Sequence, residues 1–247
     1  IMNTYVVGVS SSRFAKHPDR SFRQLADEVV RQACLDAELE DGTAVEHIVF
    51  GNCAMGSWGQ ANIRGQVALA PLMSTGFFSD HTPIVNVEGG CATGSLAFQS
   101  AHHAVLAGYA KVALALGVEK TWIAHEPAES FKLFSGGIDQ RHQAEWMHFF
   151  DEAARAGGHR FEPHERRIVF LDIHALMAKM HMSQYGSSVA DFARIAAKNR
   201  ANAVGNPNAQ YQSALSIEHV LEDRVVVEPL TRSMCAPLSD GAAAILI

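Results

Sequence analysis

The residue with the clearest capacity for chemistry is Cys91, which follows a short apolar run through a pair of glycines. The run at residues 83–87 is rich in β-branched side chains and predicts a buried strand, which Gly89 and Gly90 break. From Cys91 onward, apolar residues recur at helical spacing until Gly108. Cys91 is therefore expected at or near the first turn of a helix that follows a strand.

This position suits a nucleophile. Sulfur attacks as the thiolate, and the unpaired N–H groups and the dipole at a helix N-terminus favour that charged form of a cysteine. Glycines on either side of Cys91 would also keep side chains out of the way of a substrate. A buried structural cysteine is the alternative, and spacing alone leaves both roles open.

Three motifs extend the argument beyond one residue. Asn86 followed by CATGSxA at residues 91–97 resembles the nucleophile motif of the thiolases, and it looks most like the sterol-carrier-protein type. LALGVEK at residues 114–120 is similar to the strand and turn that follow the nucleophilic helix in that family. PLSDGAAA at residues 237–244 is similar to the strand that leads out of the first half-domain. The three motifs occur in the family's order over nearly the whole chain.

The resemblance implies a fold. The first half of a thiolase is a layered α/β unit, with a loop subdomain inserted before its last strand. Strands and helices also alternate in this sequence as far as residue 116, which argues independently for an α/β sheet covered on both faces. We expect a mixed sheet covered by helices, forming the thiolase N-terminal half at residues 1–119 and 229–247. The inserted, mostly helical loop subdomain is expected at residues 120–228.

The single elements are predicted from hydrophobic periodicity. Buried strands are expected at residues 4–9, 83–87, 111–116 and 242–247, and further strands at residues 47–52 and 224–228. Helices are expected after Ser21, after Ser187 or Ser188, and at residues 63–72, 91–108, 169–185 and 217–221. Residues 122–167 show no steady period, and we expect an irregular segment with short helices there.

Composition excludes several classes of function. The 247 residues are 48% hydrophobic and 19% charged, with a net charge of −6, so nothing favours binding to nucleic acid or to an anionic membrane. No apolar run approaches the roughly 20 residues that span a bilayer. The four cysteines form no C-x-x-C pair, and the 13 histidines form no cluster with metal-ligand spacing, so no metal site is expected. Free cysteines favour a reducing, cytoplasmic compartment.

The resemblance also implies residues that bind substrate. His181-Met182 is similar to a His-Met pair that lines the acyl-CoA pocket of thiolases, and Gly90 adjoins the nucleophile. Cys53 ends a predicted strand and Cys235 precedes the last motif, so either could lie near the site. Basic residues that could contact coenzyme A phosphates, or form a solvated face, are Arg160, Arg166, Arg167, Lys179, Arg194, Lys198 and Arg200. Aromatic residues that we expect in the core of the insert, with an acyl pocket as the alternative, are Trp122, Phe131, Phe134, Trp146, Phe149 and Phe150.

Part of a thiolase's catalytic set is absent from this sequence. In the family, a second α/β half supplies a histidine that activates the nucleophile, a second cysteine that acts as acid and base, and a further catalytic histidine. No G-H-P, C-x-G or H-E-A-F-like segment occurs here, so these roles are assigned to no residue. We expect that the second half has been truncated, with a separate chain or loss of that half as the alternatives.

The resemblance implies an acyltransferase of the β-oxidation type, acting in lipid or aromatic degradation. Cys91 would attack the keto carbon of a 3-oxoacyl-CoA and hold the acyl group until coenzyme A, a co-substrate, takes it up. No bound cofactor is expected. A retro-aldol lyase of a branched acyl-CoA and a non-catalytic half-thiolase scaffold are the alternatives. The resemblance further implies a homo-oligomer, and a small zinc-ribbon and oligonucleotide-fold partner found with some bacterial members.

Overall fold

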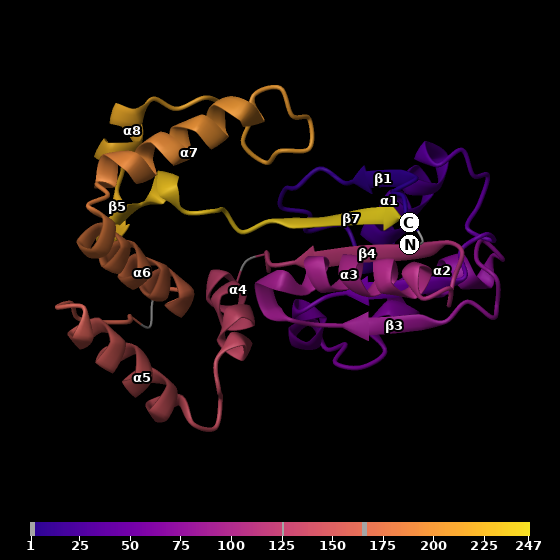
Figure 1. The fold of residues 1–247 in the computed structure, drawn as a ribbon, viewed down its shortest axis with the longest axis horizontal. Coiled ribbons are helices and arrows are strands. Elements are labelled where there is room, and N and C mark those ends of the chain that lie inside the picture. Colours follow the sequence, from indigo (N-terminus) through magenta and orange to yellow (C-terminus); the bar gives the residue numbers. More distant parts are fainter. Residues whose placement is uncertain (1–2, 125, 165–166) are drawn as a thin grey trace. The chain divides into compact units, whose positions relative to one another are not determined.

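The computed structural model describes residues 3–124, 126–164 and 167–247 and divides the chain into two compact units (Figure 1). Unit 1 contains Ile1–Trp122 and Ser239–Ile247, and unit 2 contains Ile123–Leu238. Both junctions fall later in the chain than the predicted boundaries at residues 120 and 228. The first differs because strand β4 (Ala113–Lys120) belongs to unit 1, and the second because the segment that follows residue 228 packs within unit 2.

Unit 1 is built on a five-stranded mixed sheet with the strand order β1-β7-β4-β2-β3. The strands besides β4 are β1 (Gly8–Ser11), β2 (His47–Gly51), β3 (Ile84–Val87) and β7 (Asp240–Leu246). Strand β2 pairs in parallel with both β3 and β4, whereas β7 runs antiparallel to β4 and to β1. The predicted mixed sheet is confirmed. Because β2, β3 and β4 are parallel neighbours, their carboxyl ends meet at one edge of the sheet.

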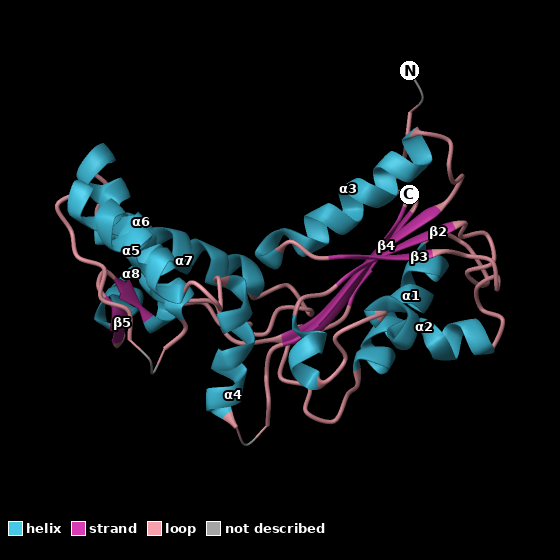
Figure 2. Ribbon diagram, turned by 90° about the horizontal axis from the view of Figure 1, so that it is seen from below, coloured by secondary structure: helices cyan, strands magenta, loops and turns pink. Residues whose placement is uncertain are grey.

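Helices cover both faces of this sheet (Figure 2). Helices α1 (Phe22–Asp36) and α2 (Arg64–Ser74) lie on one face, and α3 (Thr93–Leu106) lies on the other. Successive residues of a strand point to opposite faces, so each strand divides its side chains between the two layers. Large residues fill the α1 and α2 side, among them Leu25, Leu69, Ile48, Phe50, Leu114 and Leu116. The α3 side is rich in alanine, with Ala97, Ala101, Ala113 and Ala115.

The small residues on that second face let α3 approach the sheet closely. A Cβ atom on Gly51, at the end of β2, would lie 2.9 Å from Cγ2 of Thr93 and 3.2 Å from the Thr93 carbonyl oxygen. Real Cβ atoms essentially never lie within 3.0 Å of another heavy atom, so a side chain at Gly51 would displace the first turn of α3. The glycine therefore positions the helix that follows Cys91.

The predictions of buried strands at residues 4–9 and 83–87 were wrong in part. In the structure β1 begins only at Gly8, and Tyr5, Val6 and Val7 are at least half exposed. Val85 in β3 is also exposed. Both strands lie at the edges of the sheet, where a partner strand pairs on one side only. Their β-branched composition predicted strand structure, but burial depends on the position in the sheet.

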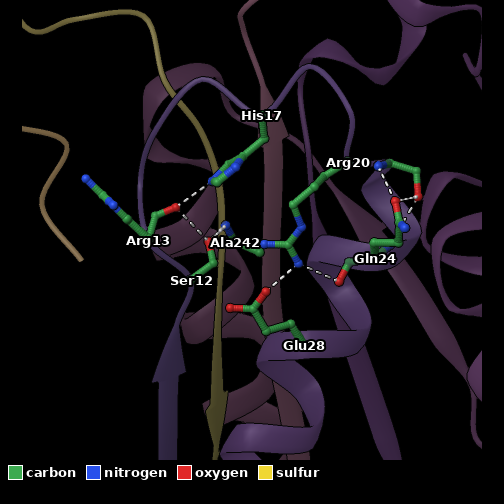
Figure 3. Close-up of polar contacts among 8 residues, drawn as sticks. Ser12, Arg13, His17, Arg20, Gln24, Glu28 and Ala242 are labelled. Carbon is green, nitrogen blue, oxygen red and sulfur yellow. Dashed lines mark hydrogen bonds and ion pairs between the residues drawn. The ribbon is translucent and has the colours of Figure 1, made fainter. Parts of the chain in front are cut away.

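Side-chain hydrogen bonds shape the segment between β1 and α1 (Figure 3). Ser12 Oγ accepts a hydrogen bond from the Ala242 N–H at 2.9 Å, and a ring nitrogen of His17 lies 2.8 Å from the Arg13 carbonyl oxygen. At the start of α1, Ser21 Oγ accepts from the Gln24 N–H, and Gln24 Oε1 accepts from the Ser21 N–H. This capping box confirms the helix start predicted at Ser21.

Lys120 and Asp240 hold together the ends of β4 and β7. The Asp240 carboxylate accepts from the backbone N–H groups of His17, Thr121 and Trp122, each at 2.9 Å. Lys120 Nζ donates to the carbonyl oxygens of His17 and Arg20. Burial lowers the pKa of Lys120, and the negative charge of Asp240 opposes that shift. Because Asp240 is fully buried and Lys120 is 3% exposed, both side chains depend on these partners.

Unit 2 is mostly helical. Its helices are α4 (Pro127–Lys132), α5 (Gln143–Ala156), α6 (Val169–Tyr185), α7 (Val189–Ala203) and α8 (Ile217–Glu222), with the short strands β5 (Val225–Val227) and β6 (Leu230–Thr231). The irregular segment predicted before residue 167 contains the regular helix α5. Its apolar side packs Trp146, Phe150 and Ala154 against α6 residues Ile173 and Leu176. Across the described parts of the chain, no helix has the length and apolar character of a membrane span.

Asp223 connects residues around β5 and β6 through hydrogen bonds, and it makes the stability of unit 2 depend on pH in the acid range. Its carboxylate accepts from Ser233 Oγ, from the Arg224 N–H and from the Arg232 guanidinium. The hydrogen bond from Ser233, aided by Arg224 and Arg232, lowers the pKa of Asp223 to about 2. A depressed pKa stabilises the folded state above the ordinary value of 3.8, and this stabilisation is lost as pH falls toward 2.

We therefore expect the free energy of unfolding of unit 2 to decrease between about pH 4 and pH 2, and part of this decrease should be absent in Asp223→Asn. Urea unfolding at several pH values, followed by hydrogen exchange of unit 2 amides, measures it. The same acid dependence in the variant and the parent protein would show that Asp223 is not responsible.

Candidate active site

Cys91 lies in a short 3-10 turn, Gly90–Ala92, between β3 and α3. Its side chain is exposed, which contradicts the alternative of a buried structural cysteine. Gly90 has a φ of +58°, a left-handed conformation that suits glycine. The Ala92 side chain makes no capping hydrogen bond to α3. The strand, the glycine turn and the helix thus occur in the predicted order, while the catalytic role of Cys91 stays a prediction.

Thr93 holds this turn in place. Its hydroxyl accepts from the Gly89 N–H at 2.9 Å and donates to the Gly90 carbonyl oxygen at 2.7 Å. The Gly90 N–H donates to the Glu88 carboxylate at 3.3 Å. The turn before Cys91 is therefore held by Glu88, which follows β3, and by Thr93, the first residue of α3.

A second cysteine reaches the turn from the neighbouring strand. Cys53 follows β2, and its Sγ lies 3.2 Å from the Gly90 carbonyl oxygen and 3.0 Å from Thr93 Oγ1. Cys53 was one of two cysteines that could lie near a site, because it ends a predicted strand, and the parallel pairing of β2 with β3 brings the two loops together. Cys235 lies in unit 2, where its Sγ contacts the Thr231 carbonyl oxygen.

Glu119, near the end of β4, is a residue of this region to which sequence analysis gave no role. Its carboxylate accepts from the N–H groups of Cys53 and Ala54 and from the side-chain amide of Asn52. Burial raises the pKa of Glu119, and these hydrogen bonds oppose the shift. The sequence signal that could have identified Glu119 is its place at the end of the apolar run LALGVEK. A carboxylate that is buried there needs hydrogen-bond donors from neighbouring residues.

The other predicted substrate residues lie in unit 2. His181 and Met182 are on α6, where His181 Nδ1 is 3.0 Å from Ser187 Oγ and its ring packs on Tyr185 with centroids 4.7 Å apart. Gly90 and Cys91 belong to unit 1. The substrate-binding role of His181, Met182 and Gly90 stays a prediction.

Several of the candidate phosphate-binding cations have carboxylate partners. Arg194 contacts Asp191 at 2.5 Å, Arg160 lies 3.8 Å from Glu162, and Arg167 Nε donates to the buried Asp172 at 2.7 Å. Arg200 donates to Ser213. Arg166 and its candidate partner Glu165 lie outside the described residues. These pairs favour the solvated-face alternative for Arg160 and Arg194.

The predicted aromatic residues separate into several environments. Trp146 and Phe150 belong to the core of unit 2, whereas Phe149 is exposed. Phe131 and Phe134 line a cavity of about 520 Å³, whose other lining residues include Ile138, Arg167 and Val169. Trp122 lies in unit 1 beneath the ammonium group of Lys16, 3.5 Å from the ring centroid. In the residues with a described position, no group of three or more His, Cys, Asp or Glu could hold a metal ion.

Comparison with known proteins places this arrangement in a family. The family model described as thiolase, N-terminal domain, matches residues 4–247. The chain is 31% identical to an acetyl-CoA acetyltransferase of Methanothermobacter thermautotrophicus, covering 98% of this chain and 56% of that protein. It is 28% identical to the benzoylsuccinyl-CoA thiolase subunit BbsB of Thauera aromatica, with coverage of 98% and 54%. It is 29% identical to human sterol carrier protein 2, with coverage of 100% and 41%.

Solved structures agree on the fold. The Ltp2-ChsH2(DUF35) aldolase superposes with a TM-score of 0.67 at 26% identity, over 98% of this chain and 54% of the other. Human mitochondrial 3-ketoacyl-CoA thiolase in complex with CoA superposes with a TM-score of 0.66 at 13% identity, over 98% of this chain and 63% of the other. A monomeric SCP2-thiolase like protein from Mycobacterium smegmatis superposes with a TM-score of 0.61 at 21% identity, over 98% of this chain and 44% of the other.

The sheet order, the exposed cysteine after β3 and these likenesses define an α/β protein of the thiolase fold. The chain belongs to the thiolase N-terminal domain family. The predicted resemblance to thiolases, including those of the sterol-carrier-protein type, is confirmed. The chain spans about half the length of the curated relatives that it matches.

Proposed function

We propose that this protein is a thiolase-type acyl-CoA C-acyltransferase in which Cys91 carries the acyl group. The observation that supports this proposal most strongly is the exposed Cys91 at the start of α3, within a chain of the thiolase N-terminal domain family. Relatives named acetyl-CoA acetyltransferase and benzoylsuccinyl-CoA thiolase subunit support the same class of reaction.

In the proposed reaction, the Cys91 thiolate attacks the keto carbon of a 3-oxoacyl-CoA. The bond between carbons 2 and 3 then breaks, so the acyl group stays on Cys91 as a thioester and the departing acyl-CoA carbanion takes up a proton. The thiol of free coenzyme A next attacks this thioester, which releases a shortened acyl-CoA and restores Cys91. The proton transfers are assigned to no residue of this sequence.

The backbone around Cys91 suits the stabilisation of the charge that develops. A tetrahedral intermediate on Cys91 carries an oxyanion, and N–H groups at the start of a helix are donors for such a charge. We assign the Cys91 N–H as one donor, because the N-cap residue Ala92 offers no side-chain cap to α3 and the turn is held by Thr93. A second donor would come from outside the described residues.

Assembly is part of the proposal. A homo-oligomer follows from the family resemblance. One relative is named a subunit, and one structural neighbour combines Ltp2 with ChsH2(DUF35), which supports a second, small partner chain. Coenzyme A and acyl-CoA are the small-molecule partners, and the cytoplasm is the proposed location.

A retro-aldol lyase is the second candidate function. The observation that favours it is the Ltp2-ChsH2(DUF35) aldolase, whose identity of 26% exceeds that of the thiolase structures compared above. Such a lyase would cleave a branched acyl-CoA into a ketone or aldehyde and a shorter acyl-CoA without consuming free coenzyme A.

The requirement for free coenzyme A distinguishes the two functions. The protein, including any further residues that its reading frame encodes, is incubated with a 3-oxoacyl-CoA or a branched 3-hydroxyacyl-CoA, with and without coenzyme A. We expect cleavage of the 3-oxoacyl-CoA only when coenzyme A is present, with two acyl-CoA products by mass spectrometry. Release of a ketone or aldehyde without coenzyme A would establish the lyase. No turnover with either substrate, alone or with candidate partner chains, would favour the scaffold alternative.

A further inference from the structure

Gly90, which immediately precedes Cys91, has both its backbone N–H and its carbonyl oxygen held by side chains. Its N–H donates to Glu88, and its carbonyl oxygen accepts from the Thr93 hydroxyl. Cys53, from the loop after β2, places its Sγ 3.2 Å from the same carbonyl oxygen and 3.0 Å from Thr93 Oγ1. Among these groups, Cys53 alone comes from outside the loop that carries Cys91.

The loop that carries Cys53 is fixed in turn by Glu119. Glu119 Oε2 accepts from the Cys53 N–H at 2.8 Å, and Oε1 accepts from the Ala54 N–H at 3.2 Å and from the Asn52 side-chain amide at 2.9 Å. Glu119 lies near the carboxyl end of β4, the other neighbour of β2. A continuous set of contacts therefore runs from β4 through the loop after β2 to the turn before Cys91.

The direction of the hydrogen bond at Cys53 follows from its neighbours. Thr93 Oγ1 accepts from the Gly89 N–H and uses its own proton on the Gly90 carbonyl. The Cys53 S–H is then the donor, either to Thr93 or to Gly90. Burial raises the pKa of the Cys53 thiol, with Glu119 and Glu88 acting in the same direction against Thr93 and Arg64, so the proton is present at neutral pH.

We propose that Cys53 is a positioning residue for Cys91: anchored by Glu119, its thiol holds the Gly90 carbonyl and Thr93 and thereby fixes the turn at the start of α3. The inference rests on the proposed function, because it takes Cys91 as the reactive thiol. The proposal gives the two exposed cysteines different roles. Cys91 reacts, and Cys53 stays protonated as a hydrogen-bond donor.

Alkylation of Cys91 tests this directly and needs no substrate. The full protein is treated with iodoacetamide, and the rate at Cys91 is measured by mass spectrometry of its own peptide. In Cys53→Ala, loss of the donor loosens the turn and so disturbs the position of the Cys91 thiol at the start of α3. We expect the rate at neutral pH to fall about three- to fivefold, a change of the size that one hydrogen bond contributes.

Matched variants separate positioning from general destabilisation. Cys53→Ser keeps a donor and should stay within about twofold of the parent rate. Cys34→Ala, in the core on the α1 face, also removes a thiol of unit 1 but should leave the Cys91 rate unchanged. Glu119→Gln should resemble Cys53→Ala, and the double variant should be no slower than either single one, because the two residues act through one set of contacts.

Two results would overturn the proposal. One is a Cys53→Ala rate that matches that of Cys34→Ala, and the other is a Cys53→Ser rate as low as that of Cys53→Ala. The outcome is independent of the acyltransferase proposal. If the parent protein never accepts an acyl group but the alkylation pattern holds, the proposed reaction fails while the positioning role of Cys53 stands.

Discussion

Replacing Cys91 by alanine is expected to lower the rate of 3-oxoacyl-CoA cleavage by at least about a thousandfold, since a nucleophile that forms a covalent intermediate has no substitute. Alanine fits at this position without strain, because the side chain is exposed and Ala92 already follows in the same turn. The fold should therefore be retained. Initial rates with saturating coenzyme A measure the effect, and circular dichroism confirms folding.

Cys34→Ala is the matched control for that experiment. Cys34 lies in the core of unit 1 on α1, where burial raises the pKa of its thiol to about 11, so it takes no part in the reaction. Its variant should keep the parent rate within about twofold. A loss of less than about tenfold in Cys91→Ala would contradict a covalent role and favour the retro-aldol function.

The second large effect concerns stability. Asp240→Ala is expected to reduce the free energy of unfolding by about 3–5 kcal/mol, because it removes the acceptor of the part-buried Thr121 and Trp122 N–H groups and the negative charge that favours the charged form of the buried Lys120. Urea denaturation monitored by tryptophan fluorescence measures it. Lys120→Met in the same chain should recover part of the loss, since no unpaired charge then remains buried.

Asp27→Ala provides the control for Asp240→Ala. Asp27 forms an exposed pair with Arg31 one turn away on α1, and such pairs contribute about 0.5 kcal/mol or less. Equal losses in the two variants would show that the buried contacts of Asp240 contribute no more than a surface pair. That result would contradict the interpretation that Lys120 and Asp240 hold the ends of β4 and β7 together.

Much of the local structure could be predicted from sequence because its causes are local. The β-branched run before two glycines predicted β3 and the turn, and the apolar spacing after Cys91 predicted α3. Ser21 and Gln24 lie three residues apart, so the capping box is visible in the sequence. Helix α6 covers the predicted residues, Val169–Tyr185, because Gly186 ends it in a left-handed conformation.

Other features depend on contacts between distant residues. Nothing in the valines of β1 and β3 shows that these strands lie at the edges, because that depends on the order of all five strands. Charged residues flank the aromatic run of α5 at Glu145 and Asp151, and the side on which Trp146 and Phe150 lie becomes clear only with α6 packed against it. Asp240 and His17 are far apart in the chain, and no sequence pattern links them.

The candidate site divides in the same way. The turn at Gly90 and Cys91 follows from neighbouring residues and was predicted. The contacts of Cys53 and Glu119 required the parallel order β3-β2-β4, which brings three carboxyl ends together. A sequence shows that each loop carries a polar or sulfur side chain, but it does not show which strands are neighbours.

Acid quenching of the protein with a 3-oxoacyl-CoA in the absence of coenzyme A, followed by peptide mass spectrometry, tests the central claim most directly. We predict the mass of one acyl group on the Cys91 peptide, as a thioester that hydroxylamine removes and added coenzyme A discharges. Cleavage of the substrate with an unmodified Cys91, or an acyl group that also forms in Cys91→Ala, would contradict it.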